Sequence, residues 1–548
     1  MATEETAETK DILKQYEKLV TRRRSYEALW REIANYVFPR RINALETRSP
    51  GQDQTELLFD STAIFANEVL SAAIQSGMTN QAMRWFDLRL RDEQLNEDDE
   101  TASWLEDSTT RMLLAFRQSN LNSELHELYL DLGAFGVGSM LIEESKKDGG
   151  LLFRTIPVGE FVIDEDEAGQ VDALYYEFHY SVRTAVARWG INSLSEDTQK
   201  LMETDPYRDL VFIHAIFPRE KRTKFGQRAM PWASVFLERD KKHKVAEGGY
   251  REFPATVPRW AKASGEVYGR SPGYTALPDI KTLNKAVELE LRALAKCIDP
   301  PMKATRNSII GKVKLGAGTL TILRDMEGLK ELVSNPRFDI SQVEKADLRQ
   351  SIKNMFFVDQ MLQLMSRDKP QMTATEVQVK VQLLQQILGP TSGRLQSELY
   401  NQLIDRTFAM MLRSGKFLPP PPQLRAQQID VQYEGPLARA QRAQQLLAIE
   451  RTLTNLQAML PLAPDVVDNV NMDETFRESA DISGAPAKII RSLEEVGNIR
   501  KVRAQKQAEQ EAAMQLQTAA EAAGKAAPAV KALVDVEQQR QGPAANVG

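Results

Sequence analysis

A long amphipathic helix just past the middle of the chain is the feature that most constrains its fold. The helix is predicted to start where Ser271 precedes Pro272 and to end at Asp299-Pro300-Pro301. At about 1.5 Å per residue, its regular part spans about 30 Å. Its apolar residues recur at steps of three and four: Ile280, Leu283, Val287, Leu291, Leu294 and Ile298. Charged residues take the opposite side: Lys281, Lys285, Glu288, Arg292 and Lys296.

A second long helix is predicted from the capping-box pattern Ser341–Glu344 to about Met365. The segment between the two helices reads as short strands and turns, at 302–305, 312–315 and 319–323. The chain therefore places two long helices on either side of a small β-rich piece.

A third helix is predicted to open at the capping box Thr373–Glu376. Its apolar stripe continues past Gly389-Pro390 to Met411. Proline lacks the amide hydrogen and crowds the carbonyl one turn back, so we expect a kink at Gly389 and Pro390.

The rest of the chain adds helices and one group of strands. Helices are predicted at 11–38, 61–76, 101–118, 123–132, 437–460 and 487–496. Strands are predicted at 151–156, 160–163, 171–180, 210–217 and 232–237. The run Gly133–Gly138 is expected to form a turn or a close helix contact. The fold class is therefore α+β and predominantly α-helical, over several structural regions, as 548 residues require.

Composition narrows the function. Formal charge is −6, from 70 Lys+Arg against 76 Asp+Glu, which argues against a protein that grips duplex DNA tightly. It does not argue against a channel through which DNA slides, and we hypothesise that a slightly acidic wall lowers friction. Cys297, the single cysteine, excludes an internal disulfide framework. No apolar run is long enough to cross a bilayer, and synthesis in a host cytoplasm is expected.

Two charged runs keep two interpretations each. Arg22-Arg23-Arg24 is either a solvated helix face or a patch for nucleic acid or a partner. Asp164–Glu167 is either an exposed acidic turn or a divalent-ion site, although no glycine-spaced calcium loop surrounds it.

Catalytic motifs are missing from the chain. Gly311-Lys312 lacks the glycine and the hydroxyl residue of a P-loop, and the four histidines are scattered without zinc-site spacing. We therefore expect no enzymatic activity, no cofactor and no metal, although scattered carboxylates could still assemble a nuclease.

The order of these elements resembles the portal (head-to-tail connector) proteins of short-tailed, podovirus-type bacteriophages. Gly269–Pro272 and Asp299–Pro301 resemble the two ends of the family's first stem helix. Further along, the family pattern is matched by 373–377, 388–390, 394–398, 468–474, 484–486 and 490–496.

The resemblance implies a division of the chain. It assigns 1–270 to a wing, 271–298 and 341–365 to the stem, 299–340 to a clip, 366–374 to a channel loop, 375–414 to a kinked wing-crossing helix, 415–499 to a crown, and 500–548 to a C-terminal barrel helix with a frayed tail. The channel-loop residues would be Ser366, Arg367, Asp368, Lys369 and Pro370.

The resemblance also implies a function. Portal subunits form rings of twelve at one unique capsid vertex of the virion, nucleate head assembly and pass double-stranded DNA. Implied partners are the terminase large subunit, the major capsid and scaffolding proteins, tail adaptor (tail tube) proteins and internal core proteins. The alternative is a helical scaffold or internal core protein of the virion without a DNA channel.

Two site assignments follow. Ile280, Leu283, Val287, Leu291 and Leu294 are candidate contacts between neighbouring stems, unless the stripe only builds the subunit's own core. Arg367 and Lys369 either touch DNA phosphates transiently or lie in a solvated helix connection.

Overall fold

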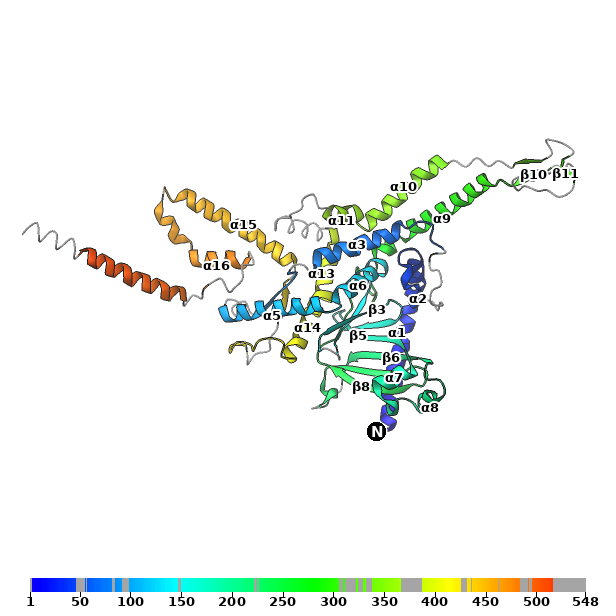
Figure 1. The fold of residues 1–548 in the computed structure, drawn as a ribbon, viewed down its shortest axis with the longest axis horizontal. Coiled ribbons are helices and arrows are strands. Elements are labelled where there is room, and N and C mark those ends of the chain that lie inside the picture. Colours follow the sequence, from blue (N-terminus) through cyan, green and yellow to red (C-terminus); the bar gives the residue numbers. More distant parts are fainter. Residues whose placement is uncertain are drawn as a thin grey trace, which may run out of the picture. The chain divides into compact units, whose positions relative to one another are not determined.

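The computed structural model divides the chain into two compact units, residues 1–97 with 104–448, and residues 98–103 with 449–548 (Figure 1). The residues that it describes are 2–45, 55, 57–80, 84–90, 98–145, 149–220, 223, 226–304, 309–310, 322–323, 329–331, 338–365, 387–424, 431–434, 436–461, 463–482, 491 and 495–515. The fold class is α+β with helices predominating, as predicted.

A five-stranded antiparallel sheet follows the order of the chain. Its strands are β4 (Phe161–Glu165), β5 (Val171–Ser181), β6 (Asp209–Pro218), β7 (Trp232–Glu238) and β8 (His243–Tyr250). The first four match the predicted strands to within two residues at each end. The fifth, β8, was not predicted, because Gly248 and Gly249 and three charged or imidazole side chains mask its alternation.

The two faces of this sheet are covered by different helices (Figure 1). The long helix α1 (Ala2–Tyr36) packs Ile12, Tyr16 and Leu19 against one face. On the other face, α7 (Val182–Trp189) buries Ala185 against Phe212, with α8 (Glu196–Thr204) beside it. Side chains alternate between the two faces along a strand. Tyr175 therefore packs on the α1 face, and its neighbour Tyr176 packs on the opposite face, where it joins the main core.

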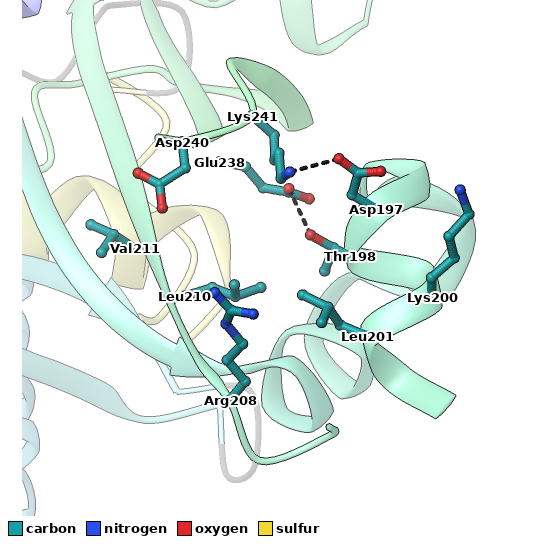
Figure 2. Close-up of a pocket in the computed structure, with 10 residues that line it drawn as sticks. All are labelled: Asp197, Thr198, Lys200, Leu201, Arg208, Leu210, Val211, Glu238, Asp240 and Lys241. Atoms are coloured by element: carbon teal, nitrogen blue, oxygen red, sulfur yellow. Dashed lines mark hydrogen bonds and ion pairs between the residues drawn. The ribbon is translucent and has the colours of Figure 1, made fainter. Parts of the chain in front are cut away.

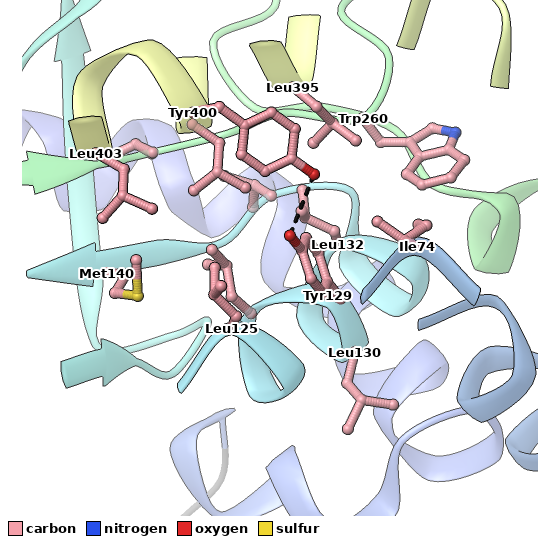
Figure 3. Packing of buried hydrophobic residues seen from close by; sticks show 14 of the residues in the cluster. Ile74, Leu125, Tyr129, Leu130, Leu132, Met140, Trp260, Leu395, Tyr400 and Leu403 are labelled. Atoms are coloured by element: carbon pink, nitrogen blue, oxygen red, sulfur yellow. Dashed lines mark hydrogen bonds between the residues drawn. The ribbon is translucent and has the colours of Figure 1, made fainter. Parts of the chain in front are cut away.

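The main core lies between helices and a small sheet. Its members include α3 (Thr62–Met78), α5 (Asp99–Gln118), α6 (Leu121–Phe135), α14 (Asn401–Arg413) and the three-stranded order β3–β2–β9, with β2 at Ser139–Glu144, β3 at Leu151–Ile156 and β9 at Ala255–Thr256. Figure 3 shows Tyr129 of α6 and Tyr400 facing each other, with hydroxyl oxygens 3.1 Å apart. Complete burial raises the pKa of Tyr129 to about 12.

The remaining elements are shorter or lie farther along the chain. They are η1 (Pro39–Arg41), α2 (Ile42–Leu45), η2 (Ile191–Ser193), η3 (Gln227–Ala229), α13 (Pro390–Leu395), a π-helical turn (Gln396–Tyr400), α15 (Pro436–Met459), η5 (Pro464–Asn469), α16 (Met472–Ile482) and a helix at 495–515. Strand β1 (Asp87–Leu90) pairs with β14 (Val431–Glu434). In the described part of the chain, no helix has the length and apolar character needed to cross a membrane.

The first predicted long helix is confirmed as α9 (Pro272–Ile298). The second is wrong as a single element, since α10 (Phe338–Met355) starts before the expected capping box and a separate helix, α11 (Val358–Met365), follows. Phe357 takes a positive φ of 58° at the break. Phe356 and Val358 are both fully buried, whereas a continuous helix would point them about 200° apart. The break therefore buries both side chains.

The segment between α9 and α10 contains two pairs of short strands. β10 (Met302–Ala304) pairs with β13 (Leu329–Glu331), and β11 (Ile309–Ile310) pairs with β12 (Ile322–Leu323), both antiparallel. The strand predicted at 312–315 lies outside the described residues.

The buried imidazole of His214 generates a pH prediction for the five-stranded sheet. Its ring nitrogens lie 2.9 Å from the Tyr176 hydroxyl and 2.8 Å from Ser234 Oγ, and burial lowers its pKa well below the ordinary value. Below about pH 6.5 the imidazole is protonated in the unfolded chain but stays neutral in the folded chain. The free energy of unfolding therefore falls by up to about 1.4 kcal/mol for each pH unit that the pH drops.

We predict that His214→Gln reduces the loss of stability between pH 7 and pH 5, measured by urea unfolding at each pH. The matched control is His179→Gln, which removes an exposed imidazole from the neighbouring strand and should leave the pH dependence as in wild type. Identical pH dependence in the wild-type and His214→Gln proteins would contradict the prediction.

Candidate assembly interface

The start of α9 is clamped against the end of α6 by small residues. Gly136 ends α6 with a φ of 81°, and a Cβ there would lie 2.7 Å from the Arg270 carbonyl carbon. A Cβ on Gly273 would lie 2.7 Å from the Ala134 carbonyl oxygen. Only glycine allows this backbone contact, so the close packing predicted for Gly133–Gly138 is confirmed.

Ser271 holds the same junction through two hydrogen bonds. Its hydroxyl accepts from the Tyr274 amide at 2.9 Å, capping α9, and donates to the Ala134 carbonyl at 2.5 Å. The predicted helix start is therefore also an anchor that sets where α9 leaves the body of the subunit.

Next along α9, polar contacts brace the helix on its neighbours. The Asn284 side-chain oxygen accepts from the amides of Phe59 and Asp60 at 2.8 and 3.1 Å. Asp60 also receives Arg349 of α10, at 2.8 and 2.9 Å. Because a buried carboxylate needs such partners, this contact joins α9, α10 and the segment before α3.

The helices α9 and α10 pack against each other directly. Ser351 of α10 donates to Asp279 of α9 at 2.7 Å. Eleven residues farther along α9, Glu290 pairs with Lys345 of α10. Figure 1 shows α9 and α10 running side by side away from the core of their unit.

The predicted inter-subunit stripe divides into two parts. Ile280 and Leu283 are 1% exposed and lie in the subunit's own core, which is the alternative that the sequence left open, and their role as ring contacts stays a prediction. Val287 packs, half-buried, at the edge of that core. Leu291 and Leu294 are 50% and 44% exposed, because the core ends before them.

Other predicted site residues lie partly outside the described structure. The channel-loop residues 366–370 are not among the described residues, nor is the helix expected before Gly389. At Gly389 itself the backbone leaves the helical region, with φ 51° and ψ −131°, and Pro390 is the first residue of α13. Whether the axis bends there stays a prediction.

The buried residue Arg259 was not anticipated from the sequence. It is 1% exposed, and all five of its guanidinium hydrogens have an acceptor. Nε and Nη2 donate to Glu398 at 3.2 and 2.7 Å, Nη2 also to the Gly169 carbonyl at 2.9 Å, and Nη1 to Glu165 and the Val267 carbonyl. Burial acts to lower the pKa of Arg259, but bonding to Glu398 and the charges of Glu398 and Glu165 raise it overall.

The two charged runs are joined by an ion pair. Arg22 of α1 pairs with Asp164 at 3.0 Å, and Arg23 donates to the Phe161 carbonyl at 3.1 Å as well as to Glu27. Both runs thus serve the contact between α1 and β4, and neither interpretation of the arginine run describes this role. In the described residues, no three metal-binding side chains gather into a candidate metal site.

A charged pocket between α8 and the sheet has a volume of about 220 Å³ (Figure 2). Two of its carboxylates are bonded: Glu238 accepts from Ser195 and Thr198 at 2.6 and 2.9 Å, and Asp197 pairs with Lys241 at 2.6 Å. This arrangement stabilises the helix start of α8 rather than offering a reactive group.

Comparisons place this architecture among known proteins. The family model described as "Bacteriophage head to tail connecting protein" matches residues 9–490. The chain belongs to the bacteriophage head to tail connecting protein family. The connector is 33% identical over 522 residues to the probable portal protein of Bordetella phage BPP-1, covering 93% of this chain and 94% of the relative. It is 29% identical over 529 residues to the portal protein of Salmonella phage epsilon15, covering 94% of each.

One solved structure, described as the neck of an empty GTA particle computed with C6 symmetry, contains a chain that aligns with this connector at 12% identity and a TM-score of 0.34. The alignment covers 78% of this chain and 98% of the other. A similarity at that level carries no conclusion. The sequence resemblance to portal proteins is confirmed by the family and its two relatives, and the connector is a structural phage protein.

The Arg259 cluster generates a stability prediction for the connector. Arg259→Met removes a buried charge and leaves Glu398, whose side chain is 15% exposed, without its cation, which should cost about 3–5 kcal/mol of unfolding free energy in urea titrations. Arg239→Met is the matched control, because Arg239 is 51% exposed and pairs with Glu177 at 3.1 Å on the surface. That control should cost less than about 1 kcal/mol. Equal effects from the two substitutions would contradict the prediction.

Proposed function

We propose that this connector is a portal subunit that forms a ring of twelve around a channel for double-stranded DNA, at one unique vertex of the capsid. The observation that carries the proposal is the outer half of α9, where Leu289, Leu291, Leu294 and Ile298 are all exposed. A soluble helix that projects beyond its core with exposed leucines needs a partner surface, since burying each leucine is worth about 1.5–3 kcal/mol.

The inner half of α9 supports the same proposal. Its side chains are fixed in the subunit core and its start is clamped by Gly136 and Ser271. The outer half is thus held at a set angle. A closed ring requires a fixed geometry between successive subunits, because the rotation at each interface must be the same.

The helix at 495–515 suits an assembled barrel. From Glu495 to Gln515 its residues are exposed apart from two half-buried positions, and the described contacts include a bidentate pair from Arg500 to Asp473, at 2.5 and 2.6 Å. A helix with so little packing gains most from neighbours, so we propose that this segment forms parallel helices around the channel. The barrel would extend into the tail at 516–548, which lies outside the described residues.

The division of the chain follows from this proposal. The wing is 1–270, the stem 271–298 and 341–365, the clip 299–340, the channel loop 366–374, the wing-crossing helix 375–414, the crown 415–499 and the barrel helix 500–548. Its proposed partners are the terminase large subunit for packaging, major capsid and scaffolding proteins, tail adaptor proteins for ejection, and internal core proteins. The protein would be made in the host cytoplasm and end in the virion.

Electron microscopy of the purified protein tests the ring. We predict end-on class averages with a central opening for wild type, and loss of rings for Leu291→Glu/Leu294→Glu, because the two new charges of each subunit cannot be buried against a neighbour. Lys296→Gln on the same helix is the control and should still form rings. Circular dichroism should show both variants folded, since neither leucine belongs to the subunit core. Rings that form unchanged in the double variant would contradict the stem contact, and wild-type protein without any ring would contradict the proposal itself.

The channel loop has its own test. Arg367→Glu/Lys369→Glu should impair genome packaging or retention while rings form normally, because twelve loops would then repel the phosphates that pass them. The measurement is the DNA content of particles that carry the variant, with Asp368→Asn as the control. Normal packaging in the double reversal would exclude this loop as a DNA contact.

A further inference from the structure

The outer half of α9 carries an exposed basic face on the side away from its apolar stripe. Leu289 is 53% exposed and lies two residues before Leu291, about 200° round the helix. Lys285 precedes Leu289 by four residues, and Arg292 and Lys296 follow it by three and seven residues. At this spacing all three lie on the same face of the helix as Leu289. We define these four residues as the basic face.

The carboxylate within this region does not cancel its charge at the surface. Glu288 pairs with Lys285 at 3.0 Å and with Arg292 at 2.5 Å, and its side chain is 16% exposed. The side chains of Lys285 and Arg292 are 60% and 69% exposed. The basic face therefore presents three cations to solvent around one leucine.

The first half of α10 has the opposite character. Both of its cations are paired, Lys345 with Glu290 and Arg349 with Asp60. The Arg349 side chain is 44% exposed, but it follows Lys345 by four residues and so lies on the side of α10 that contacts α9. The other exposed residues between 342 and 350 are Gln342, Val343, Glu344, Ala346, Asp347 and Gln350, none of which is a cation. Val343 is 63% exposed. We define Val343, Glu344 and Asp347 as the acidic face.

The two faces cannot meet within one subunit. α9 and α10 contact each other through Glu290 and Lys345. Arg292 follows Glu290 by two residues and Val343 precedes Lys345 by two, so each lies about 200° from the contact between the helices. The basic and acidic faces are thus on opposite outer sides of the helix pair, which is the arrangement that a head-to-tail assembly of identical subunits requires.

We propose that neighbouring copies of this chain associate through the basic face of one copy and the acidic face of the next. The inference rests on the proposed ring and adds a charged contact to the apolar one proposed for Leu291 and Leu294. Leu289 and Val343 supply apolar contact, and the surrounding cations and carboxylates set the partner and its direction. A two-fold contact between identical faces is disfavoured, since it would place like charges opposite each other.

Charge reversal tests the pairing. One variant, Arg292→Glu/Lys296→Glu, makes the α9 face acidic, and another, Glu344→Lys/Asp347→Lys, makes the α10 face basic. Each variant alone has two faces of the same sign, so the fraction of protein in rings should fall by at least about tenfold in electron microscopy at physiological salt.

Mixing the two variants provides the decisive measurement. The basic α10 face of one variant matches the acidic α9 face of the other, and the wild-type faces match as well, so mixed protein should form rings in which the variants alternate. The same four substitutions combined in one chain should also restore rings. This rescue separates lost pairing from lost folding.

Each outcome bears on one claim. The proposed pairing would be overturned if either variant alone formed rings, or if neither the mixture nor the chain with all four substitutions formed them. In both cases rings of the wild-type protein would still support the portal function. The absence of rings in the wild type would overturn the proposed function instead. A control reversal on the stem, Lys353→Glu, lies off both faces and should leave ring formation unchanged.

Discussion

The buried guanidinium of Arg259 is the constraint on which the arrangement of the subunit depends. Its five hydrogens are bonded to acceptors from three places: the end of β4 with the β4–β5 turn, the bend at Val267 before α9, and the π-helical turn before α14. An unpaired charge at that depth would cost several kcal/mol of unfolding free energy. The five-stranded sheet, the start of α9 and the π-helical turn before α14 are therefore coupled through this side chain.

The start of α9 is close in sequence to this cluster. Arg259 lies ten residues before Gly269, whose backbone packs on Gly136 at the end of α6 without room for a side chain. α9 thus leaves the core at an angle fixed by covalent proximity and close packing. Its inner half contributes to the subunit's stability and its outer half is exposed, so the contact with neighbouring subunits that we propose would use the part of the helix that folding leaves uncovered.

Charge in this protein is sorted by position more than by amount. Arg22 of α1 pairs with Asp164 of β4, and the first two cations of α10, Lys345 and Arg349, pair with Glu290 and Asp60. The cations of outer α9 and the carboxylates of outer α10 stay at the surface. A net charge of −6 conceals this separation, because a sum over the chain carries no information about direction.

Periodicity and breaking residues determined most elements of this chain: α9, the strands β3 to β7, and the helices of the main core follow from local patterns that tertiary contacts then reinforce. The order of these elements also identified the family. Only the tertiary structure decided which turns of a stripe are inside. Ile280 and Leu291 occupy the same stripe of α9, yet one is buried and the other exposed, since the core is built from segments far away in sequence and simply ends between them. The break at Phe357 and the burial of Arg259 have the same origin. Both are locally unfavourable, and both are stabilised by contacts with partners that no local pattern specifies.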